Sequence, residues 1–173
     1  MSINSEDLEK AKFFHELASR SLVQVSESNR RIDEKIHNTL SLTATLTPVL
    51  LGLFYYLFTA IPSRQLPLFW LILLSVAAGV VLFSASAIQG FLAYRPWVFR
   101  SLDPVTFRRQ FHNNDLLRII KKSAGTIGHI ADQNWQILMT KGSGHRRMLI
   151  FLISGVFAFM VAFVTLVVSL WLN

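Results

Sequence analysis

The sequence predicts an all-α integral membrane protein with three transmembrane helices, and two observations support this fold class. The 173 residues are 52% hydrophobic and only 16% charged, which is more apolar than an ordinary soluble domain of this length. The apolar residues gather in three runs, at 39–61, 66–93 and 148–172, and none of these runs contains Asp, Glu, Lys, Arg or His. Because about 20 mostly apolar residues span the hydrocarbon core of a bilayer, each run is long enough to cross it.

The positive charges predict the orientation, since Lys and Arg near the ends of membrane helices are retained in the cytoplasm. Six lie in the N-terminal arm, Arg64 lies between the first two runs, and ten lie between Arg95 and Arg147. This distribution predicts an N-in, C-out topology. The expected parts are a cytoplasmic N-terminal helix (1–38), a transmembrane hairpin (39–94), a basic cytoplasmic helical segment (95–147) and a third transmembrane helix (148–173). The arm 1–38 is polar and mixed in charge, so we do not expect it to be a cleavable signal.

The N-terminal arm is expected to form one long amphipathic helix. Ser5 can cap it, and Glu6 and Asp7 favour the positive end of the helix dipole. Apolar residues then recur in steps of three and four, which is a heptad pattern. The pattern fits two structures: a parallel coiled coil that gathers several copies, or a helix that packs on the basic segment of its own chain. The seam of the coiled coil would comprise Leu22, Val25, Asn29, Ile32 and Ile36.

Small, hydroxyl-bearing and aromatic residues mark the membrane helices. Thr39, Thr43 and Thr47 share one face of the first run, just before Pro48. In lipid such a face serves helix packing, or it lines a weakly polar pathway in an oligomer. Aromatic and basic residues cluster where the runs meet the cytoplasmic side. The residues expected at this interface are Arg95, Trp97, Arg100, Arg146 and Arg147.

The basic segment is expected to contain two helices. Asp103-Pro104 is a strong helix start, a second helix is expected to begin near Thr126, and Gly142-Ser143-Gly144 is expected to interrupt the chain before the third span. The charge of the segment suits acidic lipid or a nucleotide-sized anion. Nucleic acid is disfavoured, because aromatic residues are not interleaved with the charges as a stacking platform requires.

Catalytic and metal-binding patterns are weak. His112 and Asp115 lie three residues apart, but no further His, Cys or acidic cluster completes a set of four ligands. We find no glycine loop that would cradle a phosphate and no nucleophile elbow. The uncharged spans also argue against proton-coupled transport. We therefore expect no enzyme activity, no metal and no cofactor.

The layout resembles the membrane effectors of the Pycsar anti-phage systems, the PycTM family. The similar features are the helix that ends in Arg31-Ile32-Asp33-Glu34-Lys35 directly before the first span, the two-span hairpin, the cytoplasmic helical insertion, and a last span that follows Lys141 and Arg146-Arg147. The stretch Ala131-Asp132-Gln133-Asn134 also resembles the helix that this family places before its final span. The resemblance covers essentially the whole chain.

The resemblance implies a bacterial inner-membrane effector that causes abortive infection. A functionally linked nucleotide cyclase would make cyclic CMP or cyclic UMP, and the effector, a homo-oligomer in the bilayer, would respond by impairing the membrane. The candidates for phosphate contact are Arg108, Arg109, Lys121 and Lys122. Two alternatives stay open. One is an effector of the SLATT type that answers another signal, and the other is a membrane scaffold that recruits a soluble partner through its N-terminal helix.

Overall fold

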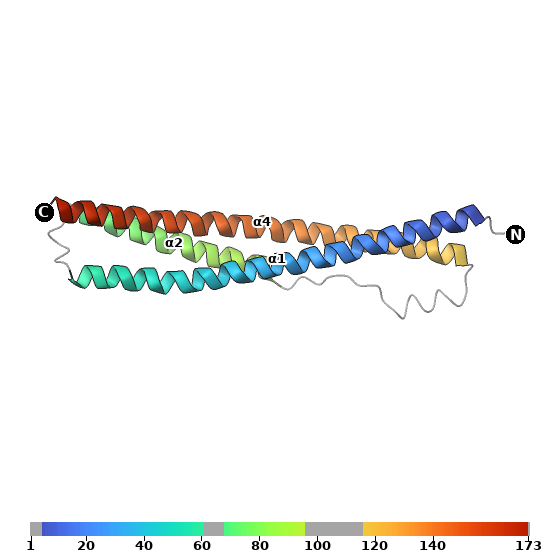
Figure 1. The fold of residues 1–173 in the computed structure, drawn as a ribbon, viewed down its shortest axis with the longest axis horizontal. Coiled ribbons are helices and arrows are strands. Elements are labelled where there is room, and N and C mark those ends of the chain that lie inside the picture. The colour runs from blue at the N-terminus through green and yellow to red at the C-terminus, as the bar shows by residue number, and fades with distance from the viewer. Residues whose placement is uncertain (1–4, 61–67, 96–115, 173) are drawn as a thin grey trace. The chain divides into compact units, whose positions relative to one another are not determined.

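The structure is a computed structural model that describes residues 5–60, 68–95 and 116–172. These residues form three helices and no strand: α1 (Ser5–Ala60), α2 (Phe69–Tyr94) and α4 (Leu116–Trp171) (Figure 1). All three helices are long and apolar enough to cross a membrane. The described residues are therefore helical apart from the helix ends, and three helices of this length and composition indicate a multi-pass membrane protein, as the sequence predicts. The expected helix start at Asp103-Pro104 lies outside the described residues.

The helix α4 is continuous, which corrects two expectations. The expected interruption at Gly142-Ser143-Gly144 and the expected helix start near Thr126 both fall inside α4. A glycine inside a helix costs about 1 kcal/mol relative to alanine. The bare backbone of Gly144 offsets this cost, because it lets α2 approach so closely that a Cβ there would lie 2.8 Å from the Cβ of Ala93. Thr126 is held within the helix by its hydroxyl, which donates to the carbonyl of Lys122 at 3.0 Å.

The chain divides into two compact units. We call Met1–Ile32 with Pro96–Thr140 the polar unit, and Asp33–Arg95 with Lys141–Asn173 the membrane unit. The membrane unit contains the three apolar runs of the sequence. Both α1 and α4 pass through the two units, whereas α2 belongs to the membrane unit alone. The helical packing of the membrane unit thus begins at Asp33 and Lys141, several residues before the apolar runs at 39 and 148.

The membrane unit is a three-helix bundle in which α2 runs opposite to α1 and α4 (Figure 1). Two polar contacts give the register of α2 on α4. The backbone nitrogen of Leu68 lies 3.5 Å from the hydroxyl of Ser169, and the buried hydroxyl of Ser86 donates to the carbonyl of Met148 at 3.0 Å. Because α2 numbers rise as α4 numbers fall, the two helices are antiparallel.

Aromatic rings fill the centre of this bundle. The ring centroid of Phe159 lies 5.5 Å from that of Phe54 on α1 and 5.5 Å from that of Phe83 on α2. The buried cluster comprises Phe54, Ile72, Phe83, Leu152, Phe159, Ala162 and Leu166. Glycines of α2 let the other helices approach: a Cβ at Gly79 would lie 2.7 Å from the Phe159 ring, and one at Gly90 would lie 2.6 Å from Leu40. Such contacts are typical of packed membrane helices.

The described part of the polar unit consists of α1 up to Ile32 and α4 up to Thr140, which run side by side in the same direction. Its buried apolar side chains come from both helices and include Ala11, Val25, Ile127 and Leu138. This arrangement agrees with the expectation that the N-terminal helix covers the basic segment of its own chain.

The heptad seam is largely occupied within one chain. Val25 in the polar unit and Ile36 in the membrane unit are buried, whereas Leu22, Asn29 and Ile32 are half-buried. This burial favours packing within the chain over the coiled coil between chains. The coiled coil between copies remains a prediction.

Candidate functional site

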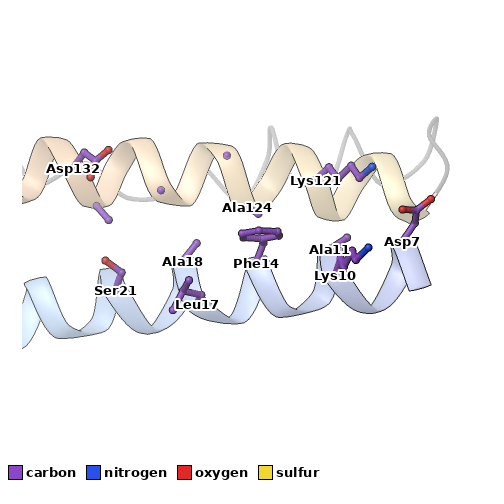
Figure 2. Close-up of a pocket in the computed structure, with 13 residues that line it drawn as sticks. Asp7, Lys10, Ala11, Phe14, Leu17, Ala18, Ser21, Lys121, Ala124 and Asp132 are labelled. Atoms are coloured by element: carbon purple, nitrogen blue, oxygen red, sulfur yellow. The ribbon is translucent and has the colours of Figure 1, made fainter. Parts of the chain in front are cut away.

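A groove of about 630 Å³ lies between α1 and α4 in the polar unit. Its α1 wall contains Asp7, Lys10 and Phe14, followed by Leu17 and Ser21 one and two turns further on (Figure 2). Its α4 wall is mostly made of small residues between two charged ones: Lys121, Ala124, Gly125, Gly128, Ala131 and Asp132. Its volume falls within the range of about 300–1,000 Å³ that is typical of small-molecule sites.

Charged side chains gather at one end of this groove. Asp7, Lys10 and Lys121 lie together there, whereas Asp132 lies at the opposite end (Figure 2). Lys10 is already engaged, because its ammonium group forms an exposed ion pair with Glu6 one turn earlier. Lys121 is exposed and has no hydrogen-bond or ion-pair partner among the described residues. Lys121 is therefore the cation at this end that is available to a ligand.

The middle of the groove combines an exposed aromatic ring with an open floor. Phe14 points from α1 towards Ala124 of α4, yet 60% of its surface remains exposed (Figure 2). Gly125 and Gly128 have nothing within 4 Å of the position where a Cβ would lie. An exposed ring facing a bare helix surface leaves room for a flat group against the ring.

The predicted phosphate-contact residues separate in the structure. Lys121 lines the groove, and Lys122 is exposed but does not line it. Arg108 and Arg109 lie outside the described residues. At the predicted inner interface, Arg95, Arg146 and Arg147 are exposed, as residues that reach lipid phosphates should be, and Trp97 and Arg100 are not described. Phe14, Asp7 and Lys10 were not predicted to be site residues. They line the groove only because α1 packs against α4, which the sequence alone does not show.

A second polar site lies in the membrane unit, where the helices begin to pack together. The ammonium group of Lys141 donates to both carboxylate oxygens of Asp33, at 2.8 and 3.0 Å. The Lys141 side chain is only 4% exposed, and that of Asp33 is 30% exposed. Both residues are charged and lie just before apolar runs in the sequence. The sequence favours Asp33 as a marker of the membrane boundary, and it does not show that Asp33 pairs with Lys141.

His145 lies one turn beyond Lys141 on α4. Its Nε2 is 3.3 Å from the hydroxyl of Thr39 on α1. Burial lowers the pKa of His145, and the positive charge of Lys35 lowers it further. The lowered pKa favours the uncharged imidazole at neutral pH, and the buried Lys141–Asp33 pair is a charged contact between α1 and α4 at this level.

The hydroxyl groups of the threonines in the first span form hydrogen bonds within their own helix. Thr39, Thr43 and Thr47 each donate to the carbonyl four residues earlier, at 2.7–2.8 Å. Thr39 and Thr43 are buried and Thr47 is half-buried. Within one chain this face therefore serves packing, which was one of the two interpretations of the pattern.

No group of three His, Cys, Asp or Glu side chains that could hold a metal ion occurs in the described part of the chain. The sequence pair His112 and Asp115 lies outside it. Among the residues that the structure describes, the groove places Lys121 at one end and the ring of Phe14 in the middle, and the Lys141–Asp33 ion pair ties α1 to α4.

No family model matches this chain, and no curated protein or solved structure is significantly similar to it. The resemblance to Pycsar effectors therefore rests on the layout and the short motifs of the sequence.

Proposed function

We propose that this protein is a bacterial antiviral effector of the Pycsar type, which impairs the inner membrane and causes abortive infection when it binds cyclic CMP or cyclic UMP. The nucleotide would come from a functionally linked cyclase. The topology would be N-in and C-out, which places the polar unit in the cytoplasm with the nucleotide. Binding would shift the bundle, or an oligomer of bundles, towards a leaky state, and no catalytic step is required.

One observation supports this proposal best: α1 and α4 each continue without a break from the polar unit into the membrane unit. A continuous helix is a stiff element, so a change in how α1 packs on α4 in the polar unit can reach the bilayer. A ligand shifts such an equilibrium only as far as it binds one packing state better than the other. A ligand in the groove between α1 and α4 would contact both helices and so could favour one packing state over the other.

The membrane potential of intact bacteria tests the proposal. Cells express the protein alone, a pyrimidine cyclase alone, or both, and a potential-sensitive dye reports depolarisation. We expect rapid depolarisation only when the protein and the cyclase are both present. Polarised cells that contain well-inserted protein and a measured rise in cyclic CMP or cyclic UMP would rule the proposal out.

A membrane scaffold is the second candidate, and exposed apolar side chains on α1 favour it. Phe13, Leu17 and Val23 are 53–63% exposed in the polar unit, where no lipid would cover them in the proposed topology. Phe13 and Leu17 lie one helical turn apart and so share a face of α1, and an exposed apolar patch marks an interaction site. A soluble partner that co-purifies with the protein, and is lost from a Phe13→Ser, Leu17→Ser, Val23→Ser variant, would support the scaffold. A SLATT-type effector would instead depolarise the membrane in response to a different signal.

A further inference from the structure

We propose that the groove of the polar unit binds a planar aromatic ring that carries a single negative charge, with the ring against Phe14 and the anion at Lys121. The proposal rests on the proposed function for the choice of cyclic pyrimidine nucleotides as probes. The site itself is argued from the groove.

The charge of the ligand follows from the groups at the end of the groove. Lys121 has no ion-pair partner among the described residues, Lys10 forms an exposed pair with Glu6, and the carboxylate of Asp7 lies at the same end. The two lysines at this end, Lys10 and Lys121, are balanced by the carboxylates of Glu6 and Asp7, so one negative charge at Lys121 meets less repulsion than two. A cyclic phosphodiester carries one negative charge, whereas a phosphomonoester approaches two at neutral pH. The groove therefore favours the cyclic nucleotide over its linear counterpart.

The shape of the ligand follows from the groove's middle. Phe14 presents an exposed ring, and Ala124, Gly125 and Gly128 leave the opposite surface without bulky side chains. A base that stacks on an aromatic ring gains affinity with little dependence on its identity.

The sequence supplies a matched control for each contact. Phe13 and Phe14 are neighbours with similar exposure, at 63% and 60%, but only Phe14 lines the groove. Lys121 and Lys122 are also neighbours, both exposed, and only Lys121 lines it. Gly128→Leu places a bulky side chain at the groove, and its Cβ meets nothing within 4 Å.

The experiment measures binding by isothermal titration calorimetry on the full-length protein in lipid nanodiscs. The probes are cyclic CMP, cyclic UMP, linear CMP, cytidine and inorganic phosphate. We expect the cyclic nucleotides to bind most tightly. Phe14→Ala, Lys121→Ala and Gly128→Leu should each weaken them at least about 10-fold, which corresponds to about 1.4 kcal/mol. Phe13→Ala and Lys122→Ala should stay within about 2-fold of the wild type, because neither side chain lines the groove and an exposed charge outside it contributes little.

The possible outcomes distinguish a failure of the proposed binding site from a failure of the proposed effector function. Equal losses in Lys121→Ala and Lys122→Ala would show a diffuse basic surface and overturn the groove. Wild-type binding that all three groove variants retain would also overturn the groove, and it would leave the effector function standing. If the folded wild-type protein binds neither cyclic nucleotide, the proposed function fails together with this site. Preferential binding of linear CMP would contradict the argument from charge.

Discussion

Lys141 carries a positive charge on a side chain that is almost completely buried, and Asp33 is the carboxylate that compensates it. Removing one partner of a buried ion pair leaves the other charge without compensation and costs about 3–5 kcal/mol, whereas replacing both by apolar residues is often neutral. The two partners are not equivalent here, because Asp33 is 30% exposed and Lys141 only 4%. Water can solvate a stranded Asp33 far better than a stranded Lys141.

We therefore expect Asp33→Leu to destabilise the protein more than Lys141→Met does. The Asp33→Leu variant should lose about 3 kcal/mol of unfolding free energy, and the double variant Asp33→Leu, Lys141→Met should recover most of that loss. Denaturant unfolding of the purified protein in detergent, followed by circular dichroism, measures all three. Additive effects of the two substitutions would show that the pair contributes no coupling.

His145 makes stability depend on pH. Its pKa is lowered in the folded protein, so the unfolded chain binds the proton more readily than the folded one. Unfolding free energy therefore rises with pH wherever the unfolded state carries more protons. The stability that His145 contributes is fully present above the unfolded pKa of about 6.5, and it is lost as the pH falls below that value.

A neutral substitution should remove this dependence. We expect His145→Gln to lose less thermal stability than the wild type between pH of about 7.5 and about 5.5, because glutamine has no proton to gain. The remaining titratable groups are the same in both proteins, so the comparison isolates His145. Parallel curves for the two proteins would assign the acid sensitivity to other groups.

At the scale of the element, the local sequence does not predict that α4 is one continuous helix. Gly142-Ser143-Gly144 has a low helix propensity, so propensity alone predicts a break. The structure shows why the helix continues: Gly144 packs against Ala93 of α2, a contact between residues that are far apart in sequence. The three spans were predictable because they depend on composition alone. The continuity was not, because it depends on a neighbouring helix.

Two glycines of α4 should respond in opposite ways to the same added methyl group. Gly125→Ala meets nothing within 4 Å and should raise the unfolding free energy by up to about 1 kcal/mol. Gly144→Ala would place its Cβ 2.8 Å from that of Ala93, so α2 must move away. Overpacking of this kind costs about 1–3 kcal/mol, and we expect a net loss of stability. Thermal unfolding compares them directly, and a gain at Gly144 would show that the helices are not in close contact there.

At the scale of the whole molecule, the sequence could supply the class of protein but only part of each site. Lys121, Asp33 and Lys141 all stood out as charged residues in the sequence. Their roles depended on partners more than 100 residues away in two cases, since Asp33 and Lys141 are separated by 108 positions. Nothing in the sequence marks Phe14 as a binding residue. An exposed aromatic ring on an amphipathic helix can be assigned to a binding site only when the residues opposite it are known.

We propose that a nucleotide bound in the polar unit changes the permeability of the membrane through α1 and α4. Purified protein in liposomes loaded with a potassium-sensitive dye tests this claim without any other bacterial component. We predict a potassium flux that begins when cyclic CMP or cyclic UMP is added to the side facing the polar unit, and that is absent with linear CMP. Intact liposomes in the presence of bound cyclic nucleotide, or a leak that is independent of it, would contradict the account.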